Sequence, residues 1–523
     1  MADCRRMSIR RRELLRGLGG LAAYACVPWS SGCADEGRDE GAQLRDRPAF
    51  LHGVASGDPL PDAVILWTRV TPVDDAPLRV HWELAEDLGF EQIIAHGEAR
   101  AEAARDFTVK LDATGLSPAT TYYYRFSAGE VQSPIGRTRT APEGSVDELR
   151  FAVVSCSSYA HGYFHAYRAV AQRLELDAVI HLGDYIYEYG TGEYGDVRDY
   201  EPEHEILTLD DYRLRYAQYR RDPDLRALHQ QLPMIAIWDD HEVANNTWLS
   251  GAENHNPDRG EGPFTPRKAA ALRAYREWMP IRDSEDGRCF RQLQYGDLVD
   301  LILLDTRNWG REQQVTKTDA PELQDPKRSL LGADQEQWLA EAMERSTARW
   351  RLIGQQVMVG PYPVYWSSDD WNGYPAARDR LLALLDEHAA KDSVLLTGDV
   401  HSSFAVDLLR DGDRSVAVEL VTPAISSPGW ERTQAESLHP MLLQQPHVKY
   451  ANLWQRGYML LDVTAERVQA AWYLYDQVED PTRASESFAA AFATYAGEHR
   501  LRPAAEPSLD TAPAPEAAPI EAS

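Results

Sequence analysis

Four short apolar stretches of the sequence are each followed at once by side chains that commonly bind metal ions. These stretches end at Val154, Leu182, Trp238 and Leu396. Thiolate, phenolate and imidazole groups suit a transition metal, whereas carboxylates suit a hard cation such as Ca²⁺. The side chains of these types that follow the four stretches are Cys156, Asp184, Tyr187, Asp240, His241, Asp399 and His401. The pattern predicts a metal site that several segments of the chain build together.

Each of these motifs also has a structural explanation. A lone Cys156 is usually a small buried hydrophobe, Asp184 can cap a helix, and His401 can be a hydrogen-bonded core histidine. The pair Asp239-Asp240 is harder to explain in this way, because adjacent carboxylates repel each other unless cations or hydrogen bonds compensate. The recurrence of such groups after four apolar stretches favours one shared site.

The region that carries these motifs, residues 147–475, is predicted to be an α/β catalytic domain. Near-continuous apolar runs alternate with segments of helical character such as 162–174 and 378–388. Runs of this kind are typical of strands buried on both faces of a layered sheet. Ligands of open α/β sheets bind beyond the carboxyl ends of the strands. The motifs are therefore expected to lie along one edge.

Residues 47–142 have a different pattern and predict a small all-β domain. Short β-type runs at 63–67, 78–82 and 121–126 are separated by turn signals. The segment 116–122 resembles a tyrosine corner, in which the hydroxyl of a tyrosine, here Tyr122, bonds to the backbone a few residues upstream. We expect a fibronectin-like or Ig-like sandwich with a structural or substrate-shaping role.

The sequence at the two ends of the chain predicts an export signal and a disordered tail. Residues 1–33 combine paired arginines, Arg11-Arg12, with a short apolar run, which resembles a twin-arginine signal peptide. The small residues before Cys33 partly match a lipoprotein cleavage site, so lipid attachment at Cys33 and a plain cleaved signal both stay open. Residues 34–46 are expected to be a linker, 476–500 a C-terminal helix and 501–523 a disordered tail.

Composition limits the partners. The formal net charge is −28, which would repel a polyanion unless the local field is reversed, so stable nucleic-acid binding is not expected. The five cysteines of the chain give no disulfide framework. A net-acidic protein can still bind an anionic partner where bound cations outweigh the nearby carboxylates.

The motifs resemble those of the metallophosphoesterase superfamily and, within it, of the PhoD-like alkaline phosphatases. The similar blocks are Gly183-Asp184-x-x-Tyr187, Asp239-Asp240-His241-Glu242, Gly398-Asp399-Val400-His401 and the stretch from Phe50 to Pro59. Cys156, Asp240 and Asp399 stand where many relatives in the superfamily have Asp, Asn and His, and these departures are themselves PhoD-like. The resemblance covers about residues 47–475 and implies a metallophosphoesterase-type β-sandwich flanked by helices.

The resemblance also implies cofactors and roles. Fe³⁺ would be bound by residues matching Cys156, Asp184, Tyr187 and His401, and Ca²⁺ would face Asp184, Asp240 and Asp399. Zinc and other divalent metals stay open in place of either. His241 and Asp240 would be catalytic residues in the two-metal scheme, in which a metal-bound hydroxide attacks phosphorus. Asn246, Arg307 and Arg378 are candidate substrate-binding residues, for each of which a structural role is also open.

The implied activity is hydrolysis of phosphate monoesters and diesters outside the cytoplasm, in a periplasmic, secreted or lipid-anchored protein. One alternative is a phosphodiesterase that acts on phospholipid headgroups, as a phospholipase D does, or on teichoic-acid-like polymers. Another is a non-catalytic cell-surface binding protein. The expected partners are the twin-arginine export machinery, the substrate and, through a lipid on Cys33, the membrane.

Overall fold

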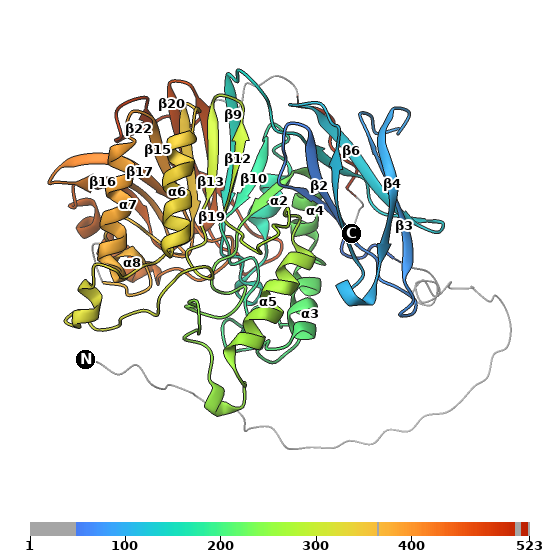
Figure 1. Cartoon of the computed structure of the whole chain (residues 1–523), viewed down its shortest axis with the longest axis horizontal. Helices are drawn as coiled ribbons and strands as arrows, with labels where there is room; N and C mark the ends of the chain where they lie inside the picture. The colour runs from blue at the N-terminus through green and yellow to red at the C-terminus, as the bar shows by residue number, and fades with distance from the viewer. Residues whose placement is uncertain (1–48, 363–365, 508–513, 521–523) are drawn as a thin grey trace, which may run out of the picture. The chain divides into compact units, whose positions relative to one another are not determined.

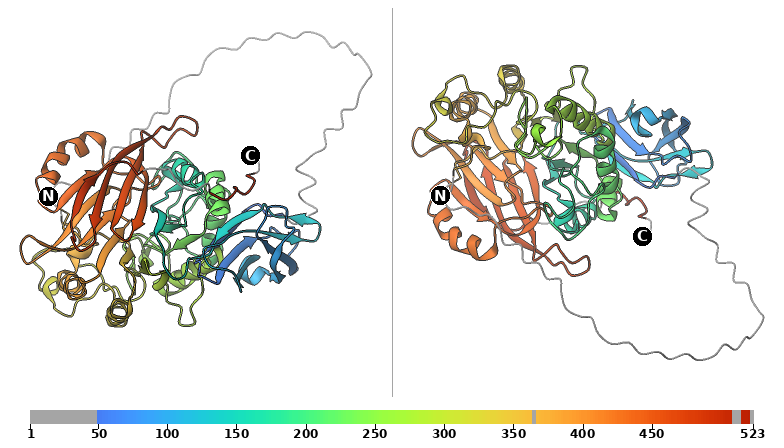
Figure 2. Two further views of the ribbon diagram at one scale, coloured as in Figure 1. Left: turned by 90° about the horizontal axis from the view of Figure 1, so that it is seen from above. Right: turned by 90° about the horizontal axis from the view of Figure 1, so that it is seen from below.

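The computed structural model describes residues 49–362, 366–507 and 514–520, and the strands of this part of the chain form three β-sheets (Figures 1 and 2). The predicted signal peptide at 1–33, Cys33 and the linker at 34–46 lie outside the described residues. No helix among the described residues is both long enough and apolar enough to span a membrane. The sheets are of mixed type, with helices alongside them, so the predicted α/β class is confirmed at that level.

The largest sheet has ten strands among the described residues, and its centre consists of four parallel neighbours, β9, β10, β11 and β1. Its strands in spatial order are β22 (Leu501–Ala504), β21 (Glu486–Tyr495), β20 (Arg467–Tyr475), β19 (Arg456–Thr464), β9 (Glu148–Val154), β10 (Ala178–His181), β11 (Met234–Ala236), β1 (Val54–Gly57), β2 (Ala63–Arg69) and β5 (Thr108–Thr114).

The second sheet has seven strands and packs against the first. In spatial order they are β12 (Arg291–Tyr295), β13 (Val299–Leu303), β14 (Trp350–Gln355), β15 (Asp392–Thr397), β17 (Arg414–Val421), β16 (Ser403–Arg410) and β18 (Val448–Asn452). Side chains alternate between its faces. Leu301 and Leu303 join a core that includes Phe151 and Val153 of the first sheet, while Ile302 joins a second core with the helices α6 and α7.

The helices lie between strands in the chain, as the sequence predicted. They are α2 (His165–Ala171), α3 (Leu209–Tyr219), α4 (Pro223–Gln231), α5 (Phe264–Trp278), α6 (Ala333–Arg345), α7 (Pro375–Glu387) and α8 (Arg432–Leu443). The helical segments predicted at 162–174 and 378–388 correspond to α2 and α7, with ends shifted by up to three residues. Figure 1 shows α6 and α7 side by side over the strands β13, β15 and β17.

The N-terminal region contributes to two sheets. A separate sheet contains β4 (Ile93–Ala101), β3 (Leu78–Ala85), β6 (Thr121–Ala128) and β7 (Val131–Gln132), and β8 (Gly136–Arg139) pairs with β6. The strands β1, β2 and β5 instead extend the large sheet, because β1 pairs in parallel with β11. The predicted boundary at residue 142 therefore does not separate one sheet from another. The tyrosine-corner contact is present, since the Ser117 N–H donates to the Tyr122 hydroxyl at 2.9 Å.

The predicted C-terminal helix at 476–500 is wrong. Residues Glu486–Tyr495 form strand β21, which pairs with β20 on one side and β22 on the other. The alanines of this segment favour a helix in isolation, but pairing between two strands outweighs that preference.

The expectation of a disordered tail is also wrong where the structure describes it. Residues 501–504 are strand β22. Further on, Ala518 is 1% exposed, and the Gln231 side chain bonds both its N–H and its carbonyl, at 3.0 and 2.8 Å. The tail has few large apolar side chains: Leu501 joins the main core, and Ala518 is held through its backbone.

Candidate metal centre

The strand order brings the predicted motifs together. The parallel strands β9, β10 and β11 are neighbours, so the residues that follow them leave the sheet at the same edge. The second sheet joins them through a bridge between Ser155 and Ala424. The approach is close: a Cβ at Gly183 would lie 2.4 Å from the backbone nitrogen of Asp239. Only glycine fits at that position.

The backbone is left-handed at four of the predicted ligands. The φ angles are 60° at Cys156, 56° at Asp184, 60° at Asp399 and 54° at His401. Residues with a Cβ seldom adopt this conformation, and such strain is found mainly at functional sites. The turns after β9, β10 and β15 therefore hold their ligand side chains in orientations that an ordinary loop would not favour.

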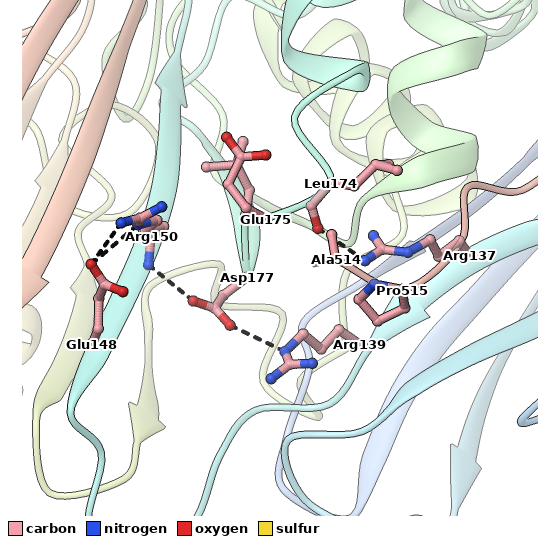
Figure 3. Close-up of a pocket in the computed structure, with 10 residues that line it drawn as sticks. Arg137, Arg139, Glu148, Arg150, Leu174, Glu175, Asp177, Ala514 and Pro515 are labelled. Carbon is pink, nitrogen blue, oxygen red and sulfur yellow. Dashed lines mark hydrogen bonds and ion pairs between the residues drawn. The ribbon is translucent and has the colours of Figure 1, made fainter. Parts of the chain in front are cut away.

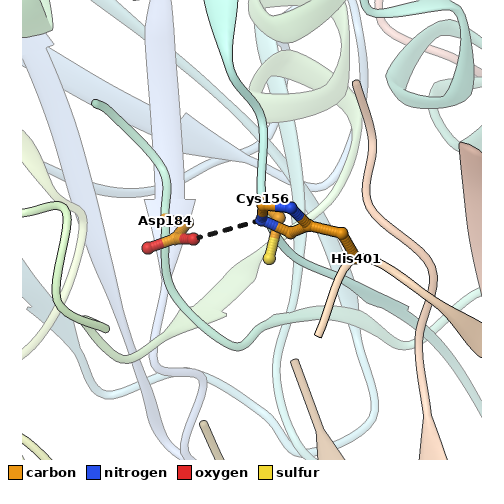
Figure 4. Close-up of side chains that lie close together, drawn as sticks. All are labelled: Cys156, Asp184 and His401. Atoms are coloured by element: carbon orange, nitrogen blue, oxygen red, sulfur yellow. Dashed lines mark ion pairs between the residues drawn. The ribbon is translucent and has the colours of Figure 1, made fainter. Parts of the chain in front are cut away.

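The first group contains Cys156, Asp184 and His401, which each offer a ligand atom within 4.8 Å of the others (Figure 4). Tyr187 joins them, because its hydroxyl donates to Asp184 Oδ2 at 2.8 Å and lies 3.2 Å from His401 Nε2. The Ser427 hydroxyl donates to Tyr187 at 2.6 Å. All four predicted iron ligands thus meet at one point.

His401 presents an unprotonated nitrogen to this group. Its Nδ1 lies 2.9 Å from the Pro428 carbonyl oxygen, which can only accept, so Nδ1 carries the proton. Burial lowers the pKa of His401 to about 4, and the ring is therefore neutral at pH 7. Its Nε2 is then free to act as a metal ligand.

The second group shares Asp184 with the first and adds Asp240 and His241. Glu188 orients His241 by accepting a hydrogen bond from Nδ1 at 2.6 Å. Burial opposes a charged His241, but Asp240, Glu188 and Asp184 outweigh it and raise the pKa of this histidine well above its usual value. The ring therefore holds a proton beside the carboxylates in the metal-free protein.

The third group shares Asp240 with the second and adds Asp239 and Asp399. Arg307 lies among these carboxylates, donating from Nε to Asp239 and from Nη2 to Asp399 at 2.6 Å. Its Nη1 donates to Asp369 at 2.7 Å. The side chain of Asp399 is 26% exposed and that of Asp239 is fully buried, so solvent reaches the group from the Asp399 side.

The electrostatics show a shortage of positive charge. Burial raises the pKa of Asp184 and of Asp399 to about 7, and it raises the pKa of the Cys156 thiol and of the Tyr187 phenol well above their usual values. Oδ2 of Asp239 is buried without a hydrogen-bond partner. Bound cations would remove these penalties. The donor sets also fit, since the first group offers S, N and O atoms and the third only carboxylate oxygens.

Glu242 connects the two strand-end loops beneath the carboxylates. It is buried and accepts hydrogen bonds from the backbone N–H groups of Asp184 (3.1 Å), Tyr185 (2.7 Å) and Asp239 (2.8 Å). Burial raises the pKa of Glu242 to about 8. A carboxylate that accepts from both loops fixes the distance between the first and third groups.

The three predicted substrate-binding residues have different surroundings. Arg307 lies in the third group, as described above. The backbone N–H of Asn246 donates to Asp240 at 2.6 Å, while its side-chain amide donates to Glu253. Arg378 is not brought to the cluster: its Nε donates to the Val359 carbonyl, and it forms no ion pair with another residue that the structure describes.

Several residues of the centre were not among the site residues predicted from the sequence. Asp239 and Glu242 stand within the Asp239-Asp240-His241-Glu242 motif, and Glu188 follows Tyr187 directly, so proximity to the motifs was an available signal. Asp369 and Ser427 come from long loops far along the chain. No periodicity or spacing marks these two, and only the fold shows their place.

Comparison with known proteins gives a consistent result. Residues 151–472 match the model of the PhoD-like phosphatase family, and residues 33–142 match that of the PhoD-like phosphatase N-terminal domain. Alkaline phosphatase D of Bacillus subtilis (strain 168) is 38% identical over 517 residues, covering 91% of this chain and 87% of that protein. The solved structure of PhoD superposes with a TM-score of 0.81 at 36% identity, covering 88% of this chain and 93% of that one.

Proposed function

The chain belongs to the PhoD-like phosphatase family, and we propose that it is an exported, metal-dependent hydrolase of phosphate monoesters and diesters. Its reaction class, phosphoric ester hydrolysis, follows from the family. The observation that carries the proposal is the chain of three metal-competent groups linked by Asp184 and Asp240. Two shared carboxylates between neighbouring groups are what a site for adjacent cations requires.

We assign Fe³⁺ to Cys156, Asp184, Tyr187 and His401, and Ca²⁺ to the carboxylate side at Asp184, Asp240 and Asp399. The mixed S, N and O donors of the first set support a transition metal, and the all-oxygen donors of the second support a hard cation. The fold that we propose for the two packed sheets is the metallophosphoesterase sandwich, with an Ig-like or fibronectin-like N-terminal domain.

When bound, the cations would activate a water molecule and neutralise the phosphate oxygens. The protein itself orients the reacting groups. Glu188 fixes the ring of His241 through Nδ1, so the ring can hold a proton where the leaving oxygen departs. Asn246 holds Asp240 through its backbone N–H. Arg307 positions the carboxylates of Asp239 and Asp399, to which its buried guanidinium donates.

Export and location are part of the same proposal. The paired arginines and apolar run within residues 1–33 support export through the twin-arginine machinery, with a final location outside the cytoplasm. Lipid attachment at Cys33 would tie the enzyme to a membrane surface. Labelling with a radioactive fatty acid, compared between the full chain and Cys33→Ser, tests this attachment.

The activity is tested by turnover of p-nitrophenyl phosphate and of bis-p-nitrophenyl phosphate by the purified, metal-replete protein. We expect hydrolysis of both. Turnover of the diester alone would make the protein a phosphodiesterase, and turnover of neither would remove the enzymatic proposal. Elemental analysis with an absorption spectrum tests the metals: Fe³⁺ bound by thiolate and phenolate should give a visible charge-transfer band. A colourless zinc protein with full activity would exclude iron.

A further inference from the structure

Aromatic rings extend outwards from His241, next to the metal-competent groups. Tyr187 stacks on His241 with ring centroids 4.2 Å apart, and Tyr194 stacks on Tyr187 at 5.5 Å. Tyr189 lies 4.8 Å from Tyr194 and 5.5 Å from His241. His161 meets Tyr194 edge-on at 4.4 Å. The inner rings are buried, and the three outer rings, those of His161, Tyr189 and Tyr194, are partly exposed.

The outer tyrosines are not used by the centre itself. The hydroxyl of Tyr187 bonds to Asp184 and Ser427, but those of Tyr189 and Tyr194 make no hydrogen bond to any residue in the described part of the chain. Nδ1 of His161 lies 2.9 Å from the Ser158 hydroxyl, which fixes the ring. Partly exposed aromatic rings with free polar ends are a common feature of ligand-binding surfaces.

The position of these rings follows from the segment that orients His241. Tyr187, Glu188 and Tyr189 are consecutive, so the turn that brings Glu188 to His241 also brings Tyr189 beside the same imidazole. A group that leaves by taking a proton from His241 would therefore depart next to the three outer rings. The aromatic stretch at 370–375 offers no such surface, because Trp371 and Tyr374 are 1% and 0% exposed.

We propose that His161, Tyr189 and Tyr194 form a leaving-group subsite that favours phosphate esters whose leaving group contains a planar aromatic ring, such as an aryl group or a nucleobase. The subsite rests on the proposed phosphoesterase function and specifies its substrate class. The rings stack on the leaving group, and the tyrosine hydroxyls bond to its polar substituents. Stacking favours a planar ring over an open-chain alcohol of similar size.

The test compares kcat/KM for phenyl phosphate with kcat/KM for glycerol phosphate in the wild type and in variants. The phenyl-to-glycerol ratio of kcat/KM in each variant is divided by the same ratio in the wild type, so the intrinsic reactivity of the two esters cancels. Tyr194→Ala and Tyr189→Ala should each lower the phenyl-to-glycerol ratio by about fivefold, in line with the loss of one aromatic contact. Tyr194→Phe should keep the ratio, because the ring remains.

Tyr495→Ala is the matched control, since this tyrosine is 38% exposed on strand β21 and belongs to no part of the centre. It should leave both rates unchanged. Equal losses on the two esters in Tyr194→Ala and Tyr189→Ala would overturn the subsite and show that the rings only support Tyr187. A wild type that turns over neither ester would instead remove the phosphoesterase function. Metal content measured for every variant separates both results from simple loss of the centre.

Discussion

Arg307 and Arg137 are both buried, at 0% and 1% exposure, yet their surroundings are opposite. Arg137 has no carboxylate within 4.0 Å among the described residues; its guanidinium donates to the main-chain carbonyls of Gln231 (3.1 Å) and Leu174 (3.0 Å). Figure 3 shows it beside Ala514 and Pro515. These residues line a pocket of about 300 Å³. Arg307 contacts the carboxylates of Asp239, Asp240, Asp369 and Asp399.

The difference shows which of the two regions needs bound cations. Burial lowers the pKa of Arg137, because the nearby Asp177 and Glu175 only partly offset the loss of water around its charge. Burial also opposes the charge of Arg307, but the surrounding carboxylates outweigh it and raise its pKa. The acids at this edge of the two sheets, which we call the rim, are Asp184, Asp239, Asp240, Asp369 and Asp399, with Glu188 beside them. Arg307, Arg311 and a protonated His241 are too few to neutralise them all, so the rim needs further cations. The surroundings of Arg137 need none, and this residue joins strand β8 to the end of α4 and the loop before β10.

The contrast between the two regions would disappear if the rim carboxylates only neutralised Arg307 and bound no metal. Asp184 tests this, since it is no ion-pair partner of Arg307 but belongs to two of the metal-competent groups. Asp184→Asn keeps the shape and removes the charge. We expect kcat/KM for p-nitrophenyl phosphate to fall by more than about a thousandfold, as for other essential groups, together with the metal content. Full activity with normal metal content would exclude Asp184 as a bridging ligand.

Substituting each of the two arginines measures how strongly the stability of the protein depends on it. In the metal-free protein, Arg307→Met leaves buried carboxylates without a partner, and we expect a loss of about 3–5 kcal/mol in the free energy of unfolding. Arg137→Met removes an unpaired charge and leaves only two main-chain carbonyls unmet, so we expect a loss of about 1–2 kcal/mol. Urea unfolding of both variants measures the difference. Equal losses would mean that the rim acids do not depend on Arg307.

The rim should also respond to pH near neutrality. Asp184 and Asp399 have folded-state pKa values of about 7, raised by burial above the value of an unfolded chain. Their contribution to the stability of the metal-free protein is therefore complete below about pH 4 and is lost as the pH rises through about 7. Removing the metals with a chelator should lower the melting temperature more at pH 8 than at pH 5.5. A larger loss at pH 5.5 would contradict this assignment.

The same contrast explains which parts of the molecule could be predicted from the sequence. At the rim, strands are short apolar runs and their ends are marked by Cys156, Asp184, Asp240 and His401, so chemistry and position coincide in the sequence. Parallel pairing then brings the ends together. Asp369 and Ser427 could not be found in this way, because their loops are placed by packing between distant segments.

The prediction for the C-terminal region was wrong because its structure depends on contacts with other parts of the chain. Composition records what a segment could bury, and residues 486–520 have few large apolar side chains. Their structure comes instead from partners elsewhere: β20 pairs with β21, and the Gln231 side chain holds Ala518. Alanine content predicts a helix only when no neighbouring strand offers its backbone. A pattern within the segment cannot show such partners.

Removing residues 508–523 gives the smallest expected effect and tests whether the C-terminal segment at 514–520 stabilises the region around Arg137. The truncation loses the Gln231–Ala518 pair, the bond from Gln230 to the Pro519 carbonyl and that from the Tyr123 hydroxyl to the Glu516 carbonyl. Because water can replace part of these bonds, we expect the free energy of unfolding to fall by about 1–2 kcal/mol.

The kcat/KM of the truncated protein for p-nitrophenyl phosphate should stay at the wild-type value, since none of these contacts involves a residue of the metal centre. Gln231→Leu, which removes the two bonds to Ala518 and keeps the rest of the segment, should reproduce part of the stability loss. A truncated protein as stable as the wild type would show that the segment only rests on the surface. A truncated protein that loses its metals would mean that α4 transmits the contact to β11 and Asp239, so that the two regions depend on each other.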